Sequence, residues 1–298
     1  MRAVIGGGMM RAVHERVPIA VRCADGWILR GERLPGEGPV VVCGHAMMVD
    51  RRTLDRPRGA GLAATLASRG FDVLLLDARG HGESVPRADQ GGRWSYDDVV
   101  RHDVPAMVRY ARELARGRPV VVLGHSLIGH AAMIAAGLAD PPDAVVAYAP
   151  NLWAPKLEPS ALARAAKASV LFGWTLATRA RGFFDAPALG MGTDPEPAPY
   201  VAQFASMWRR DRLASPDGAI DYEAALARAA LPVLAVSSEG DRLLARPPAV
   251  ARFVALMRLA SVEHRVLRGR GAPDHMGFVL AARALWEETC AWIEERVG

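Results

Sequence analysis

The chain contains little lysine and no concentrated block of positive charge. Lysine occurs only at Lys156 and Lys167, so arginine carries almost all of the basic charge, and the formal net charge is +5. The arginines are scattered along the sequence, and no long basic stretch has aromatic residues interleaved with it. We therefore expect a solvated basic surface and no nucleic-acid partner.

Cysteine is also scarce. Cys23, Cys43 and Cys290 lie far apart, and no C-x-x-C spacing occurs. This pattern excludes a disulfide framework and a cysteine-based zinc site. It is typical of proteins in a reducing compartment, so we expect a cytoplasmic location.

No segment is a convincing membrane span or signal peptide. Residues 120–139 lack Asp, Glu, Lys and Arg, which a hydropathy window could take for a span. A turn signal in the middle of this stretch favours a buried strand followed by a buried helix. The apolar stretch between Arg2 and Arg11 is short and broken by glycines, which argues against a signal peptide.

The length and composition predict one large α/β domain with an insertion. The 298 residues are 51% hydrophobic and 23% charged, as in folded globular proteins. The predicted elements are a hairpin of 16–23 with 27–34, strands beginning at Val40, Phe71, Val120 and Ala144, and helices over 58–69 and 97–114. This alternation predicts a mostly parallel sheet with helices on both faces.

The alternation stops after Pro150 and resumes at Leu231. Residues 151–230 are rich in Ala, Pro, Trp, Phe and Arg, and they predict a helical insertion that is broken near Pro195, Pro197 and Pro199. We therefore divide the chain into a first core part (1–150), a helical cap insertion (151–230) and a second core part (231–298).

The most informative motif is Gly124-His125-Ser126-Leu127-Ile128-Gly129, directly after the apolar run 120–123. It predicts a strand, a sharp turn and a helix, with Ser126 held out of the sheet beside the positive end of the helix. A nucleophilic hydroxyl needs this geometry. Ile128 stands where G-x-S-x-G has its last glycine, so the helix must shift outward or face a small residue.

A nucleophilic serine needs a base to accept its proton and a carboxylate to orient that base. Asp241 follows the predicted strand 231–238, and His275 follows the predicted strand 261–267. Both therefore lie past the carboxyl ends of strands, where α/β sheets build their sites. The chain order serine, acid, histidine is the order of the strand-turn-helix arrangement.

Other interpretations of these residues stay open. Ser126 could be a turn serine or a helix N-cap, and Glu239 and Asp274 are rival acids. The rival histidines are His45, His81, His125, His130 and His264. No pair of histidines has ligand spacing with a third ligand, so we expect no metal and no cofactor. The spacing of His45 and Asp50 also matches an H-x-x-x-x-D motif of another acyltransferase group, on two residue types alone.

Taken together, these motifs resemble those of the α/β-hydrolase family along nearly the whole chain. Residues 40–45 look like the strand and turn that lead to the family's oxyanion-hole loop, and 77–84 look like its D-x-R-G-x-G-x-S loop. The resemblance implies nucleophile, acid and base roles for Ser126, Asp241 and His275. It also implies that the amides of Met47 and Leu127 form the oxyanion hole, although Ala46 stands where the family usually has glycine.

The resemblance implies a serine hydrolase that cleaves an ester or a related acyl compound. The alternatives are an acyltransferase or thioesterase with the same triad, or a hydrolase-like protein that only binds its ligand. The predicted partner is a small, apolar acyl compound. We expect the insertion to lie over the nucleophile, with Trp153, Trp174, Phe183 and Trp208 lining an apolar pocket. Packing of the insertion onto the core would explain the same aromatic residues.

Overall fold

The fold is built on one mostly parallel sheet, seen in a computed structural model that describes residues 14–298. The segment between Arg2 and Arg11 therefore lies outside the described residues. The sheet has eight strands in the order β1-β2-β4-β3-β5-β6-β9-β10. Their bounds are β1 (Val17–Arg22), β2 (Ile28–Leu34), β3 (Val40–Gly44), β4 (Asp72–Leu76), β5 (Val120–His125), β6 (Ala144–Tyr148), β9 (Pro232–Ser238) and β10 (Ser261–Leu267).

Within this sheet, the six adjacent strands β4-β3-β5-β6-β9-β10 pair in parallel. β2 pairs antiparallel with both β1 and β4. The predicted α/β-hydrolase fold class is therefore confirmed. β3 and β5 lie at the centre, and both are fully buried runs of mainly valine. Such strands need helices on both faces, and the carboxyl ends of β5, β9 and β10 come to one edge of the sheet.

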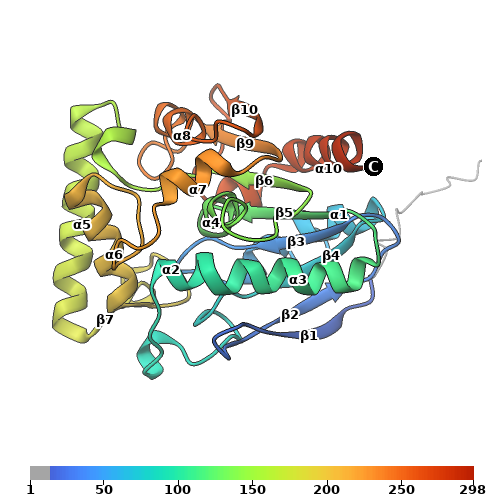
Figure 1. Ribbon diagram of the computed structural model, residues 1–298, viewed down its shortest axis with the longest axis horizontal. Coiled ribbons are helices and arrows are strands. Elements are labelled where there is room, and N and C mark those ends of the chain that lie inside the picture. Colours follow the sequence, from blue (N-terminus) through green and yellow to red (C-terminus); the bar gives the residue numbers. More distant parts are fainter. Residues whose placement is uncertain (1–13) are drawn as a thin grey trace, which may run out of the picture.

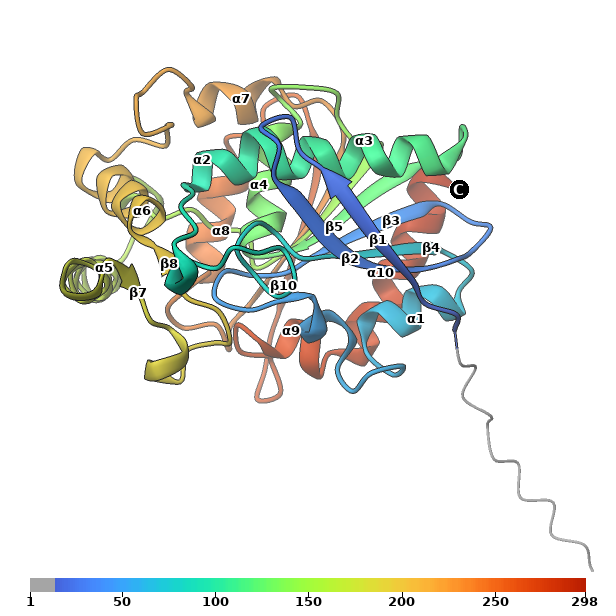
Figure 2. The same ribbon diagram turned by 90° about the horizontal axis from the view of Figure 1, so that it is seen from below.

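Helices cover both faces of the sheet (Figure 2). On one face, α3 (Val104–Ala115) packs against β3 and β5, and α4 (Leu127–Ala135) packs against β5 and β6. On the other face, α1 (Leu62–Ser68) packs against β4, and α10 (Arg283–Val297) against β6. α8 (Pro247–Val254) packs on β9 and β10, and the short α9 (Gly277–Leu280) follows the loop after β10.

Two predicted helices differ in their bounds. The helix expected over 58–69 begins at Leu62, because Pro57 and Ala60 close a turn before it. The helix expected over 97–114 begins as α2 (Tyr96–Asp98), continues through one π-helical turn and becomes α3. Pro105 has no N–H to donate to the preceding turn, and this favours the wider turn there.

The segment between β6 and β9 is mainly helical, and most of it lies at one end of the sheet (Figure 1, left), while its last helix packs against α4. It contains α5 (Ala161–Arg181), α6 (Ala198–Arg210) and α7 (Tyr222–Arg228). α5 begins after Ser160, whose hydroxyl accepts the Ala163 N–H, and ends at Gly182 with φ 83°. Pro197 and Pro199 start α6, where a missing N–H is harmless.

This segment also contains a small antiparallel pair of two-residue strands, β7 (Phe183–Phe184) and β8 (Glu196–Pro197), which the sequence did not predict. Strands this short carry no periodic pattern. Single 3-10 turns complete the fold, at Arg51–Asp55, Ala88–Gln90, Pro155–Leu157 and Pro187–Leu189.

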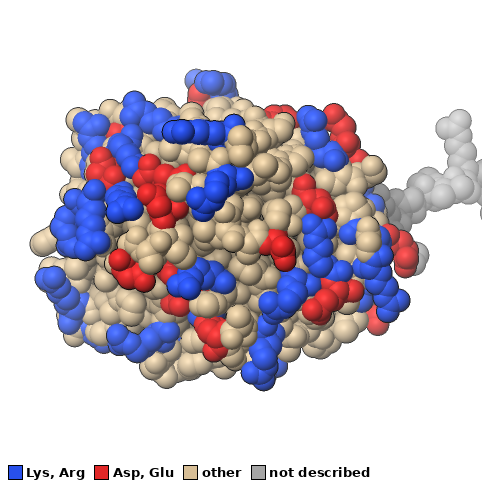
Figure 3. Space-filling model, viewed as in Figure 1, with Lys and Arg blue, Asp and Glu red and all other residues tan. Residues whose placement is uncertain are grey.

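The charged side chains are scattered over the surface, as the arginines are along the sequence, and the cysteines are not paired with one another. Basic and acidic side chains are interspersed on the face shown in Figure 3 and form no continuous basic stripe there. Cys23, Cys43 and Cys290 are free and buried. Within residues 14–298, no helix has both the length and the apolar character needed to cross a membrane.

Candidate active site

Ser126 lies at the tip of a sharp turn between β5 and α4. Its backbone has φ 48° and ψ −101°, which is unfavourable for a residue with a Cβ and costs about 1–3 kcal/mol. The Ser126 N–H donates to the Tyr148 carbonyl of the neighbouring strand β6 at 2.8 Å. The turn is thereby fixed between two strands, and the serine side chain is displaced from the sheet toward a cavity.

The turn requires α4 to approach the sheet closely, and paired small residues allow it. A Cβ at Gly124 would lie 2.2 Å from the Gly129 nitrogen, so this position has no room for a side chain. Gly129, one place later than in G-x-S-x-G, therefore fills the role of the missing glycine. Ile128 packs against Gly44 at the end of β3. Gly44 is thus the small residue that leaves room for the branched side chain of Ile128.

His275 and Asp241 form a hydrogen-bonded pair beside this turn. The Nδ1 atom of His275 lies 2.6 Å from Oδ2 of Asp241. Burial alone would raise the pKa of Asp241, but the hydrogen bond and the charge of His275 hold this pKa below its usual value. Oδ2 of Asp241 accepts the Nδ1 proton of His275, which leaves Nε2 as the nitrogen that can accept a proton.

The rival acids are engaged elsewhere. Glu239 accepts a hydrogen bond from Arg268 at 2.8 Å, and Asp274 accepts the Gly277 N–H at 2.8 Å. The other oxygen of Asp241, Oδ1, accepts the Leu244 N–H at 2.9 Å. This bond fixes the carboxylate plane and leaves Oδ2 for the histidine.

His125, a rival base that we expected to pack or bond locally beside the serine turn, contacts the histidine loop instead. Its Nε2 lies 2.8 Å from the His275 carbonyl oxygen. Burial lowers the pKa of His125 to about 3, so the ring is neutral and donates its Nε2 proton to that carbonyl. The residue before the nucleophile thereby positions the loop that carries the base, a long-range contact that no local sequence pattern signals.

The turn after β3 carries the amide that we expected in the oxyanion hole. Burial lowers the pKa of His45 to about 4. Its neutral ring accepts the Ala78 N–H on Nε2 at 2.9 Å and so donates from Nδ1 to the Ala46 carbonyl at 2.7 Å. The N–H of Met47 belongs to the same trans peptide and points the opposite way from that carbonyl.

Ser126, His275 and Met47 line one cavity of about 130 Å³. Its walls are largely apolar and include Trp153, Trp174, Met191, Phe204 and Met276. This volume equals roughly four water molecules at about 30 Å³ each and is well below that of drug-sized ligand pockets, roughly 300–1,000 Å³. A larger hollow of about 800 Å³ borders Asp241 on another side, but neither Ser126 nor His275 lines it.

Two of the four predicted pocket aromatics line the cavity, and two do not. Trp153 and Trp174 stack with ring centroids 5.6 Å apart, and the Trp153 indole N–H donates to the Leu244 carbonyl at 3.1 Å. Phe183 lies in β7, opposite Pro197. Trp208 lines a separate groove between α5 and α6, together with Phe172 and Leu176. Aromatic content alone could not show which helix face meets the cavity.

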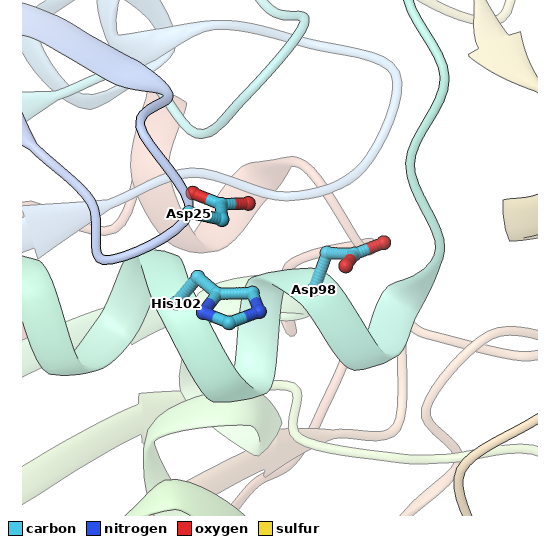
Figure 4. A group of neighbouring side chains, drawn as sticks. All are labelled: Asp25, Asp98 and His102. Carbon is cyan, nitrogen blue, oxygen red and sulfur yellow. The ribbon is translucent and has the colours of Figure 1, made fainter.

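A group of side chains away from the cavity has a donor set that a metal ion could use (Figure 4). Ligand atoms of Asp25, Asp98 and His102 lie within 4.8 Å of one another. We had considered only histidine pairs, so this cluster was missed. Asp25 accepts a hydrogen bond from Arg79 at 2.7 Å, and Asp98 accepts the N–H of Ser95, the N-cap residue of α2, at 2.6 Å. The two carboxylates thus have structural roles, and none of the three residues lines the cavity.

Sequence comparisons point to hydrolases. A family model described as "Serine aminopeptidase, S33" matches residues 55–188. Triacylglycerol lipase 2 of Arabidopsis thaliana is 32% identical over 137 residues, which are 39% of this chain and 32% of the relative. Human lysosomal acid lipase/cholesteryl ester hydrolase is 28% identical over 122 residues, 36% of this chain and 31% of the relative. The chain spans about a third of the length of these curated relatives.

Solved structures share the fold over almost the whole chain. An esterase of Pyrococcus furiosus has a TM-score of 0.68 at 15% identity, covering 100% of this chain and 97% of that chain. E-2-(acetamidomethylene)succinate hydrolase has a TM-score of 0.59 at 20% identity, covering 94% of this chain and 100% of that one. At these identities the similarity establishes the fold and not the substrate.

Proposed function

We propose that this chain, which has the α/β-hydrolase fold, is a serine hydrolase that cleaves small carboxylic esters. The observation that carries this proposal is the convergence of Ser126 and His275 on one cavity, with Asp241 bound to the far nitrogen of the histidine. The similarity to lipases and to an esterase supports the ester bond as the target.

In the proposed mechanism, Oγ of Ser126 attacks the ester carbonyl carbon. Nε2 of His275 takes the hydroxyl proton and then gives it to the leaving alcohol. Asp241 keeps the proton of neutral His275 on Nδ1 and stabilises the imidazolium that forms. Water, activated by the same histidine, then cleaves the acyl-Ser126 ester and regenerates the enzyme.

The negative charge that develops on the carbonyl oxygen needs two donors in place before the reaction. We propose that these are the N–H groups of Met47 and Leu127. Leu127 is the first residue of α4, so its N–H is unused by the helix and lies at the positive end of the helix dipole. The bond from His45 to the Ala46 carbonyl supports an orientation of the Met47 N–H toward the cavity.

The cavity supports a short apolar acyl group as the substrate. With room for roughly four water molecules, it would hold a chain of a few carbon atoms. Residues 151–230 supply Trp153, Trp174 and Phe204 to its walls, so we propose that this segment is a cap that selects the acyl group. We also propose a cytoplasmic location, which the three unpaired cysteines support.

A fluorophosphonate probe tests the proposed nucleophile independently of the substrate. We expect one equivalent of label on Ser126, located by mass spectrometry, and no label on Ser126→Ala. Hydrolysis of p-nitrophenyl butyrate should be lost in the same variant. Adding methanol or a thiol during hydrolysis measures how the acyl-enzyme divides between water and another acceptor, which separates a hydrolase from an acyltransferase. A folded wild-type protein that does not label would refute the proposal.

A further inference from the structure

Residues of the helical segment clamp the turn that carries the Met47 amide. Met48 has a left-handed backbone with φ 63°. Its N–H donates to Oε1 of Glu196 at 2.9 Å. Its carbonyl accepts the N–H groups of Thr193 at 2.8 Å and Asp194 at 3.0 Å. The approach is so close that a Cβ at Gly192 would lie 2.0 Å from the Met48 oxygen.

Glu196 is held in place by a histidine of the core. Nε2 of His81 lies 3.0 Å from Oε1 of Glu196, and both side chains are fully buried. Nδ1 of His81 donates to the Arg79 carbonyl at 2.8 Å. Burial alone would lower the pKa of His81, but the Glu196 carboxylate raises it to about 9. His81 is therefore a cation at neutral pH and donates from both nitrogens.

Two apolar side chains at these positions would stabilise the fold at least as well as this ion pair does. Burying two charges costs nearly as much as their attraction returns. In addition, Oε2 of Glu196 is buried without a hydrogen-bond partner among the described residues. The pair is better explained by the backbone turn that it holds in place. Glu196 orients the Met47–Met48 peptide, just as His45 orients the peptide before it and the Thr193 and Asp194 amides orient the peptide after it.

We propose that Glu196 is a positioning residue of the oxyanion hole: it reaches from the helical segment into the core and holds the Met48 amide, so that the amide of Met47 stays directed at the substrate oxygen. His81 acts through Glu196 by holding its carboxylate in line with the Met48 N–H. This inference rests on the proposed hydrolase function, and it assigns the helical segment a part in transition-state stabilisation besides substrate selection.

The test compares Glu196→Ala and Glu196→Gln with wild type, and uses Glu223→Gln as a matched control. Glu223 belongs to the same segment and pairs with Lys156, away from the cavity.

With p-nitrophenyl butyrate we expect kcat of Glu196→Ala to fall about 100-fold, because a small displacement of a catalytic group has that effect. KM should stay within about twofold, since an ester in its ground state makes less use of the hole. Glu196→Gln keeps an acceptor for Met48, so its kcat should fall less, by about threefold to tenfold. Glu223→Gln should match wild type.

Hydrogen exchange provides a readout that does not depend on activity. The Met48 amide is buried and bonded, so its exchange in a peptide covering 46–50 should be slow in wild type and in Glu223→Gln. It should be clearly faster in Glu196→Ala, which has no acceptor for this N–H, and faster by a smaller factor in Glu196→Gln. If Glu196→Ala does not fold, Glu196→Gln carries the test with the same two measurements.

The outcomes separate the two proposals. Wild-type protein that fails to label with the phosphonate overturns the hydrolase function and, with it, this role of Glu196. Wild-type protein that labels, together with folded Glu196 variants of unchanged kcat and unchanged exchange, overturns the role of Glu196 alone.

Discussion

Ile128 fits against Gly44 so closely that a methyl group at Gly44 would lie 2.2 Å from the Ile128 Cγ2 atom. The two residues are 84 positions apart, in α4 and at the end of β3. This contact reconciles a branched side chain after the nucleophile with a helix that stays close to the sheet. The departure from G-x-S-x-G is thus compensated by a glycine on the next strand.

The first prediction concerns this pair. Gly44→Ala should lower the free energy of unfolding by about 1–3 kcal/mol, because the added methyl group overpacks the contact. Ile128→Ala should lower it by about 2–5 kcal/mol through a cavity. The double variant should be at least about 1 kcal/mol more stable than the sum of the two losses implies. Urea unfolding of the four proteins measures this, and strict additivity would show that the two side chains do not compete for space.

The second prediction concerns the backbone strain at Ser126. Ser126→Ala and Ser126→Gly should both lose hydrolysis and labelling. Ala keeps the unfavourable positive φ, whereas Gly relieves it, so we expect Ser126→Gly to be about 1 kcal/mol more stable than Ser126→Ala. Thermal and urea unfolding check the order of the two variants. The reverse order would mean that the turn carries no strain.

The third prediction concerns the acid of the proposed triad. Asp241→Asn should lower kcat by about 10,000-fold, because an amide stabilises the wrong tautomer of His275. Glu239→Gln and Asp274→Asn are the matched controls, since each changes a nearby acid whose partner is not His275. Their kcat should stay within about threefold of wild type. Steady-state kinetics decide the assignment, and a large loss in either control would transfer the role to that residue.

The fourth prediction concerns the size of the acyl group. Wild type should hydrolyse p-nitrophenyl acetate and butyrate faster than octanoate, because the cavity of about 130 Å³ has no room for the longer chain. Each methylene that the pocket excludes forgoes about 1–3 kcal/mol of apolar contact. Trp174→Ala should shift the optimum toward longer chains by enlarging the cavity. Trp208→Ala is the control, since this tryptophan lies outside the cavity. If both variants keep the wild-type profile, the helical segment does not select the acyl chain.

The fifth prediction concerns stability at alkaline pH. The pKa of His81 is raised from 6.5 to about 9 in the folded protein. Its contribution to stability is therefore complete below pH 6.5 and is lost as the pH rises through about 9. The loss should be on the order of 3 kcal/mol. Urea unfolding between pH 6 and pH 10 measures it.

Glu196→Gln is the control, because without the carboxylate the pKa of His81 should fall and this alkaline loss should shrink. Other titratable groups around the pair do not imitate the effect. Burial lowers the pKa of His45 to about 4 and raises that of Tyr200 well above 10, so neither titrates in this window. Asp194 is the remaining charged side chain near His81, and it is unchanged in the control variant. Equal alkaline losses in wild type and variant would contradict the prediction.

Local patterns were enough to predict the fold class. Uninterrupted valine runs predicted the central strands, and their alternation with helical segments predicted the parallel sheet. The strained serine turn follows from a motif of six adjacent residues. Asp241 and His275 each follow a strand, so the carboxyl edge of the sheet predicts their proximity, while their catalytic roles stay predictions.

Contacts between distant segments could not be predicted. Glu196 and His81 are 115 residues apart, and neither belongs to a periodic pattern that indicates the other. The same holds for the bond from His125 to the His275 carbonyl. Trp174 and Trp208 look alike in sequence, and which face of α5 or α6 meets the cavity depends on how the two helices pack.

The bonds from residues 193–196 to Met48 bear on any attempt to exchange the helical segment between related hydrolases. A domain graft that takes the whole stretch from β6 to β9 from another protein would remove the Thr193 and Asp194 amides and the Glu196 carboxylate from the core turn. The better crossover points lie on either side of residues 191–197, so that this short stretch is inherited with the sheet. Chimaeras joined there should retain turnover while their preference for acyl groups changes.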